Sequence, residues 1–233
     1  MKGVIVSAGL GTRLRPITNI ISKNLLPVYN KPMIYYGIET LKKAGITELL
    51  LVVNKMDIDQ YKTLIRNGEE FNIPITYTIQ EEQKGTAHAV GCAEEFADGE
   101  NIAVLFADNI LEDDLNFRDF KEGARIHLKE VPNPEIFGIA EIKGNKIISL
   151  EEKPKNPKSN YCIIGVYAYD KDVFDHIKTL KPSARGELEI TDLNRIYLNK
   201  CKLDYRIIKG FWNDAGTFDD MLTVSNLIKK NIK

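Results

Sequence analysis

An apolar run at residues 4–6 ends in a loop that carries two glycines, Gly9 and Gly11. A short apolar run bounded by a turn is typical of a strand that is buried on both faces of a sheet. A glycine-rich turn after such a strand exposes backbone N–H groups that can surround an anion. Arg13 and Lys23 follow closely and add positive charge that neither a turn nor a core requires. This segment therefore predicts a receptor for a polyphosphate.

Two common phosphate-binding loops do not fit this segment. A P-loop ends in Gly-Lys-Ser/Thr, whereas Gly11 is followed here by Thr12 and Arg13. A dinucleotide-binding fingerprint needs a third small residue where Leu14 stands, and an acidic residue after the second strand, where this chain has Asn54. The sequence thus disfavours a nicotinamide-dependent enzyme.

Strand-like and helix-like segments alternate along the first half of the chain. Strands are expected at residues 3–6, 49–53, 75–79 and 102–107, and helices at 32–44, 60–66 and 85–97. Pro32 is expected at the first helical position, and Gly45 ends that helix. This order predicts an α/β fold, with a Rossmann-like, mostly parallel sheet and helices on both of its faces.

The second half is more mixed. Runs at residues 136–142 and 147–150 flank a Lys-Gly-Asn turn and predict a small antiparallel hairpin. Further strands are expected at 161–169 and 203–208, and helices at 173–180, 191–199 and 218–230. The apolar stripe of the last helix is expected to pack on the core or on a second subunit, which leaves a homo-oligomer open. Because no repeat or linker is found, residues 1–233 are expected to form a single domain.

Composition and charge argue against a nucleic-acid-binding, membrane or secreted protein. The chain has 32 basic and 33 acidic residues, a net charge of −1, so no overall field favours nucleic acid or a membrane surface. No signal peptide and no apolar run of membrane-spanning length are found. The three cysteines are far apart and form no CxxC motif, which is typical of a reducing compartment. We therefore expect a cytoplasmic protein.

Two aspartates stand where a metal ion could be held. Asp108 directly follows the strand at 102–107, and in open parallel sheets the carboxyl ends of strands form the ligand crevice. Asp214 lies in a turn rich in glycine and aromatic residues before the last helix. An isolated aspartate often only caps the next segment. One or two carboxylates together with phosphate oxygens, however, are the usual ligands of Mg²⁺.

Several segments resemble the sugar-1-phosphate nucleotidyltransferases (nucleotide-sugar pyrophosphorylases), most closely their glucose-1-phosphate thymidylyltransferase branch. The resemblance rests on the series Gly11-Thr12-Arg13-Leu14, Pro16, Lys23, Pro27 and Lys31-Pro32, and on the segments at 107–109, 150–154, 183–192 and 212–217. It covers essentially the whole chain and implies a single nucleotidyltransferase domain with the nucleotide-diphospho-sugar transferase fold. Arg185, within the segment at 183–192, could instead simply pair with an acid.

The resemblance also implies roles for individual residues. Arg13, Lys23 and Lys153 would be catalytic, and Asp108 and Asp214 would bind Mg²⁺. The nucleotide would be bound by Ala8, Gly9, Gly11, Thr12, Gln80, Gly85 and Thr86, and the sugar phosphate by Gly138, Glu152, Lys153 and Tyr167.

The reaction implied is NTP plus sugar-1-phosphate giving NDP-sugar plus pyrophosphate, with dTTP and glucose-1-phosphate as the best specific choice. A carboxamide such as that of Gln80 can pair with the edge of uracil or thymine. The segment at 85–89, which contains His88, and the loop at 7–11 are closer to uridylyl enzymes, so UTP stays open. His88 itself is interpreted as a packed or surface histidine. A non-catalytic sugar-nucleotide-binding module is a third alternative, but it would not need both Asp108 and Asp214.

Overall fold

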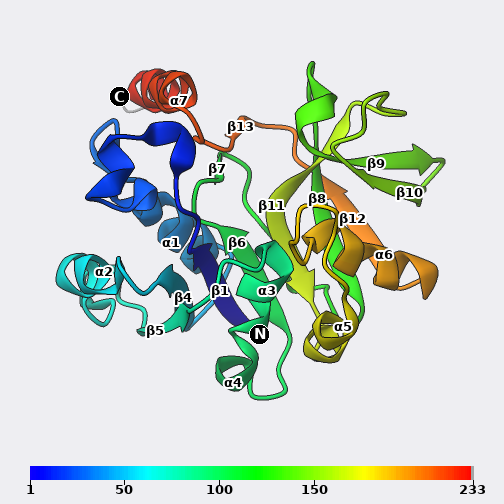
Figure 1. Cartoon of the computed structure of the whole chain (residues 1–233), viewed down its shortest axis with the longest axis horizontal. Helices are drawn as coiled ribbons and strands as arrows, with labels where there is room; N and C mark the ends of the chain where they lie inside the picture. The colour runs from blue at the N-terminus through cyan, green and yellow to red at the C-terminus, as the bar shows by residue number, and fades with distance from the viewer. Residues whose placement is uncertain (232–233) are drawn as a thin grey trace.

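The structure, a computed structural model, describes residues 1–231 and is built on one nine-stranded sheet (Figure 1). Its main path runs β10-β9-β11-β6-β1-β4-β5, and β8 and β12 extend it from β11. The strands are β1 (Lys2–Ser7), β4 (Leu49–Asn54), β5 (Ile75–Gln80), β6 (Ile102–Phe106), β8 (Ala124–Glu130), β9 (Gly138–Lys143), β10 (Lys146–Glu152), β11 (Tyr161–Tyr169) and β12 (Leu203–Ile207). The predicted parallel core is confirmed, because β6, β1, β4 and β5 pair in parallel.

The second half of the sheet is antiparallel around β11. This strand pairs with β6, β8 and β9, and its register with β8 shifts between Ile163 and Tyr167. The hairpin of β9 and β10 confirms the predicted one. Strand β8 was not among the predicted strands, because Arg125 and His127 interrupt its apolar pattern. Both side chains are buried, and His127 Nδ1 lies 3.1 Å from the Val166 carbonyl oxygen.

Helices cover both faces of the sheet, as predicted. Alternate residues of β1 point to opposite faces, so that Val4 packs in one core and Ile5 in the other. The core that contains Ile5 is covered by α1 (Met33–Lys43) and α2 (Ile58–Ile65). The opposite core is covered by α3 (Thr86–Gly91), α4 (Glu94–Ala97), α5 (Val173–Thr179) and α6 (Ile190–Asn199).

Two helix predictions need correction. Helix α1 begins at Met33, so Pro32 precedes it at the N-cap and pairs with Pro27 between the short strands β3 (Lys31–Pro32) and β2 (Pro27–Val28). The single helix predicted at 85–97 is two short helices, α3 and α4, with a break after Gly91.

The chain between β1 and α1 contains three 3₁₀ turns, η1 (Thr12–Leu14), η2 (Ile17–Asn19) and η3 (Lys23–Leu25). The last helix, α7 (Phe218–Asn231), lies beside this segment at one end of the molecule (Figure 1). Val224 of α7 is buried against Val28 and Met33, which confirms a core role for its apolar stripe. Leu222, by contrast, is 62% exposed. No helix in the described part of the chain is both long and apolar enough to cross a membrane.

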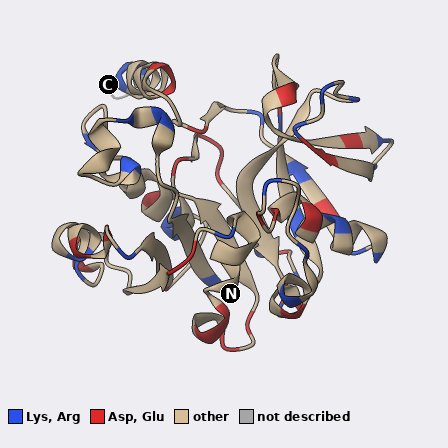
Figure 2. Cartoon of the chain, in the orientation of Figure 1, with Lys and Arg blue, Asp and Glu red and all other residues tan. Residues whose placement is uncertain are grey.

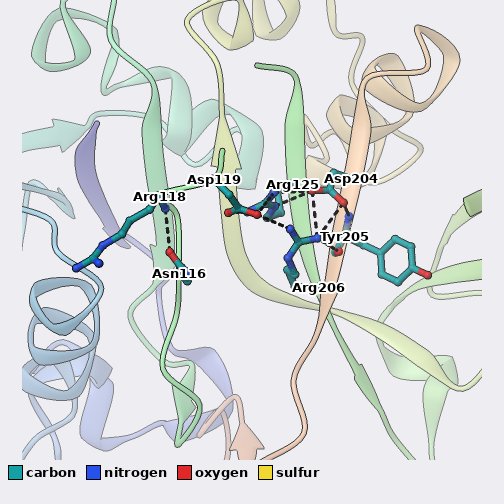
Figure 3. Close-up of polar contacts among 7 residues, drawn as sticks. All are labelled: Asn116, Arg118, Asp119, Arg125, Asp204, Tyr205 and Arg206. Atoms are coloured by element: carbon teal, nitrogen blue, oxygen red, sulfur yellow. Dashed lines mark hydrogen bonds and ion pairs between the residues drawn. The ribbon is translucent and has the colours of Figure 1, made fainter. Parts of the chain in front are cut away.

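Charged residues are dispersed over the helices and loops (Figure 2), but one ionic network is concentrated at β8 and β12. Arg125, which is only 4% exposed, donates hydrogen bonds to Asp119 at 2.6 Å and to Asp204 at 2.6 Å. Arg206 reaches the same Asp119 carboxylate at 2.6 Å (Figure 3). The two carboxylates therefore neutralise an arginine that the sheet buries.

This network predicts a pH-dependent contribution to stability. Hydrogen bonds from Arg125 first, and then from Arg206, lower the pKa of Asp119 to about 2. A carboxyl whose pKa is depressed on folding stabilises the protein above its unfolded pKa, near 4, and loses that contribution as the pH falls toward 2. We expect the difference in free energy of unfolding between wild type and Asp119→Asn to be largest at pH 5 and to shrink by pH 2.5. Denaturant titrations at both pH values measure it, and a difference independent of pH would contradict the assignment.

Candidate active site

A cleft of about 690 Å³ opens at the carboxyl end of β6, between the glycine-rich loop side of the sheet and the β9–β10 hairpin with α6. Eight residues predicted from the sequence line it: Arg13, Thr86, Asp108, Gly138, Glu152, Lys153, Tyr167 and Asp214. Its lining also includes residues that were given no role, among them Asn109, Glu189 and Trp212. A larger hollow of about 940 Å³ lies over α2 and contains no predicted site residue. The predicted site residues that line a cavity are therefore found in the smaller cleft.

The glycine-rich loop presents unpaired donors. Gly11 has a φ of 61°, a left-handed conformation that favours glycine, and its carbonyl accepts a 2.8 Å hydrogen bond from Thr18 Oγ1. The amides of Gly9, Leu10 and Gly11 donate to no other group in residues 1–231. Arg13 likewise forms no hydrogen bond or ion pair within these residues. Backbone amides and an arginine without partners are expected of a loop that can bind an anion.

Two cations and two carboxylates meet at one end of the cleft. Lys23 Nζ forms an ion pair with Asp108. Burial, and then the neighbouring Asp108 carboxylate, raise the pKa of Asp214, while Arg13 and Lys23 oppose this shift. Gly216 lets the Arg13 guanidinium approach, because a Cβ there would fall 3.0 Å from Arg13 Cζ. Lys23 was predicted to face phosphate, whereas here its partner is Asp108.

Asn109 connects the two candidate metal carboxylates, a role that the sequence did not reveal. Its Nδ2 donates to Asp108 Oδ1 at 2.8 Å. Its Oδ1 accepts from Trp212 Nε1 at 2.8 Å and from the Gly165 amide at 2.9 Å. Because Trp212 lies two residues before Asp214, one buried carboxamide ties Asp108 to the turn that carries the second aspartate. In the sequence, only the position of Asn109 next to Asp108 could have indicated this role.

A second buried network fixes Lys23. The Tyr61 hydroxyl, from α2, lies 2.5 Å from Ser7 Oγ and 2.7 Å from Ser22 Oγ. Asn24 Nδ2 donates to the same Ser7 Oγ at 2.6 Å. Ser22 and Asn24 flank Lys23, so both of its neighbours are tied to the end of β1. Burial raises the pKa of Tyr61 to about 12, which keeps this hydroxyl protonated and able to donate.

Acidic residues and one arginine form a hydrogen-bonded group in the lining of the cleft. Glu152 Oε2 accepts a 2.6 Å hydrogen bond from Thr191 Oγ1. Arg185 forms a double hydrogen bond with Glu189, at 2.9 Å to each carboxylate oxygen, and lies 3.5 Å from Glu152 Oε1. The pairing of Arg185 with an acid is therefore confirmed. Glu189 is buried, which the sequence did not indicate.

Lys153 and Tyr167 differ in their surroundings. Lys153 is exposed and has a φ of 44°, an uncommon conformation for a residue other than glycine, and such positions are frequent at binding sites. Tyr167 is buried, and burial raises the pKa of its hydroxyl well above its ordinary value. Tyr167 therefore presents a neutral phenol to the cleft.

Gln80, at the end of β5, contacts the start of α3, next to Thr86 of the cleft. Gln80 Nε2 lies 3.3 Å from the Gly85 carbonyl oxygen and 3.0 Å from His88 Nδ1. Gly85 has a φ of 104°, and a Cβ there would fall 2.6 Å from the Leu188 carbonyl oxygen. The fold alone therefore requires this glycine. His88, interpreted from the sequence as a packed or surface residue, is half-buried and in contact with Gln80.

The sequence is similar to those of known nucleotidyltransferases. A family model described as "Nucleotidyl transferase" matches residues 2–231, and the chain belongs to the nucleotidyl transferase family. It is 41% identical to a glucose-1-phosphate thymidylyltransferase of Neisseria meningitidis, over 98% of this chain and 83% of that protein. It is 39% identical to a glucose-1-phosphate thymidylyltransferase of Mycolicibacterium smegmatis, over 98% of this chain and 82% of that protein.

Two solved structures are also similar. A provisionally assigned glucose-1-phosphate thymidylyltransferase from Bacillus anthracis, in complex with sucrose, has a TM-score of 0.92 and 43% identity and covers 100% of this chain and 96% of its own. A UDP-glucose pyrophosphorylase complexed with UDP-glucose has a TM-score of 0.87 and 25% identity, over 99% of this chain and 98% of its own. Both confirm the nucleotide-diphospho-sugar transferase fold.

The network around Tyr61 predicts a catalytic effect at a distance from the cleft. Tyr61→Phe keeps the ring but removes the hydroxyl that joins Ser7 to Ser22, so Lys23 loses part of its support. We expect turnover to fall roughly tenfold to a hundredfold, with a loss in the free energy of unfolding of about 1 kcal/mol. Steady-state nucleotidyl transfer and denaturant unfolding measure the two effects.

The control is Tyr77→Phe, since the Tyr77 hydroxyl donates to the Arg66 carbonyl outside the cleft. If both variants lost turnover equally, the Tyr61 hydroxyl would have no special role in placing Lys23.

Proposed function

We propose that the chain transfers a nucleotidyl group from dTTP to glucose-1-phosphate, giving dTDP-glucose and pyrophosphate. The observation that carries this proposal is that one cleft is lined by the unpaired Arg13, by the carboxylates of Asp108 and Asp214, and by Glu152 and Lys153. The choice of dTTP is supported by the curated relatives, which are glucose-1-phosphate thymidylyltransferases. UTP is the second candidate, because the segment at 85–89 and the UDP-glucose complex of a structural relative favour it.

The reaction needs no general base. The phosphate of glucose-1-phosphate already carries an ionised oxygen near neutral pH, and this oxygen attacks the α-phosphorus of the nucleotide. The bond from that phosphorus to the bridging oxygen breaks, and pyrophosphate leaves. Catalysis therefore depends on positioning and on charge stabilisation. Arg13, with the amides of Gly9 to Gly11, would hold the triphosphate, and Lys153 would orient the attacking phosphate. Lys23 would exchange its pairing with Asp108 for one with phosphate.

Asp108 and Asp214 fit a magnesium ion that arrives with the nucleotide. Among residues 1–231 no group of three or more side chains could hold a metal by themselves. Asp108 and Asp214 both line the cleft, and two carboxylates would leave the remaining coordination positions of the ion to phosphate oxygens and water. When bound, Mg²⁺ would neutralise charge on the triphosphate and on the leaving pyrophosphate. Asn109, which donates to Asp108, would orient that ligand.

The proposed partners are thus dTTP or UTP and a sugar-1-phosphate, with no nucleic acid or membrane. The dispersed charges agree with small, locally bound anions (Figure 2). The cytoplasm remains the proposed compartment, because the three cysteines of the chain are free thiols.

A pyrophosphate-release screen tests the function. Wild-type protein with Mg²⁺ is assayed with dTTP, UTP, CTP or GTP, each against several sugar-1-phosphates. We expect the highest kcat/KM with dTTP and glucose-1-phosphate, and a fall of roughly 10²- to 10³-fold in Arg13→Ala, because one preorganised charge is lost. The melting temperature should change little, since Arg13 is exposed and forms no ion pair within residues 1–231, so that solvent screens its effect on the nearby carboxylates.

Arg15→Ala is the matched control, since Arg15 is also exposed on this loop but does not line the cleft. Equal losses in the two variants would show that loop charge in general, and not Arg13, is required. A wild-type protein that released no pyrophosphate with any pair of substrates would overturn the proposed function.

The metal assignment predicts opposite effects on stability and activity. In Asp214→Asn the like-charge repulsion with Asp108 disappears, so without metal the variant should be as stable as wild type or more stable. Its Mg²⁺-dependent turnover should fall by at least about 10²-fold, as should that of Asp108→Asn. Thermal melts without metal and rates across a Mg²⁺ titration measure this, with the exposed Asp59→Asn as control. Near-wild-type rates at limiting Mg²⁺ would exclude the residue concerned as a ligand.

A further inference from the structure

The orientation of the Gln80 carboxamide is fixed by its surroundings. Gln80 ends β5 and is only 4% exposed. The group 3.3 Å from one end of its carboxamide is the Gly85 carbonyl oxygen, which can only accept a hydrogen bond. The end that faces Gly85 must therefore be the NH₂ group.

The same NH₂ group determines the protonation of His88. Nδ1 of His88 lies 3.0 Å from Gln80 Nε2, so Nδ1 must accept this hydrogen bond and carry no proton. Burial, and then the nearby Lys84, lower the pKa of His88, whereas Glu82 opposes them. A neutral imidazole with a bare Nδ1 is therefore the form expected at neutral pH. Gly85 and His88 together occupy both N–H bonds of the carboxamide.

Gln80 Oε1 is left as the free end of the side chain. It accepts no hydrogen bond from any group in the described residues 1–231. Gln80 can thus offer a ligand an acceptor but not a donor, as long as His88 holds the NH₂ group. N3 of uracil and thymine carries a hydrogen and can donate to such an acceptor. N3 of cytosine carries a lone pair and would face Oε1 with no hydrogen between them.

We propose that His88 is a positioning residue that locks the Gln80 carboxamide with Oε1 toward the base, and so selects uracil and thymine over cytosine. The inference rests on the proposed function, which assigns Gln80 to the nucleotide site. It gives His88 a role through Gln80, without contact to the reacting atoms. It leaves the choice between dTTP and UTP to other groups, because both bases present the same N3–H.

Substitutions at His88 separate this role from simple packing. His88→Leu cannot accept the hydrogen bond, so only the 3.3 Å contact with the Gly85 carbonyl oxygen still orients the carboxamide, and its NH₂ group can turn toward cytosine more readily. His88→Asn is the conservative variant, since Asn Oδ1 stands at the same distance along the side chain as His Nδ1 and can accept. His176→Leu is the control, because His176 lies on the surface against Lys200 and outside the cleft.

The measurements are kcat and KM for dTTP, UTP and CTP at saturating glucose-1-phosphate, and calorimetric binding of UTP and CTP alone. In His88→Leu we expect the preference for dTTP or UTP over CTP to fall roughly 10- to 100-fold, as a hydrogen bond is unmade. The change should appear in KM and in the dissociation constants, with kcat for dTTP within about twofold. His88→Asn should regain most of the preference, and His176→Leu should keep all of it.

Two failures can be told apart. An active wild type whose His88→Leu variant keeps its preference against CTP would overturn the role of His88 and leave the proposed function intact. A wild type that is inactive and binds no nucleotide would overturn the proposed function and this inference with it. A loss of preference in His88→Leu that His88→Asn did not restore would assign the effect to packing and reject the hydrogen-bond lock.

Discussion

The candidate site depends on holding two carboxylates, Asp108 and Asp214, in one cleft at the end of the sheet. Burial first, and then repulsion from the Asp108 carboxylate, raise the pKa of Asp214. Lys23 and Arg13 offset that repulsion, and Asn109 fixes the geometry through hydrogen bonds to Asp108 and Trp212. In the proposed function, Mg²⁺ arriving with the nucleotide would neutralise the two carboxylates once Lys23 and Arg13 pair with phosphate.

Buried neutral hydrogen bonds position the charged groups around this centre. The Tyr61 hydroxyl joins Ser7 at the end of β1 to Ser22 beside Lys23, and its high pKa keeps it neutral. The contact between Gln80 and His88 orients a carboxamide in a comparable way. Such networks cost little desolvation compared with buried charges, and they restrict side chains to one orientation. The charged groups can then remain exposed to substrate while their supports are inaccessible to it.

Strand β8 and the roles of Tyr61 and Asn109 were difficult to predict for the same reason. Strand β8 contains Arg125 and His127, and two polar residues in a short segment do not indicate that the segment is a buried strand. Asp119 and Asp204 make that burial tolerable, but they come from segments far apart in the sequence. Similarly, Tyr61 and Asn109 gave no functional signal, because their partners are contributed by other elements. Burial of a polar residue can be recognised only when the groups that satisfy it are known.

The sequence by itself determined the parallel core, the glycine-rich loop and the family. Periodicity and glycine placement act over a few residues, and the motifs at 11–14, 107–109, 150–154 and 212–217 are contiguous. Only the tertiary structure decided the pairing of Lys23 with Asp108, the bridge through Asn109 and the contact of His88 with Gln80. These depend on distances between side chains on different elements. Local propensity does not encode such distances, because packing of the whole sheet and its helices sets them.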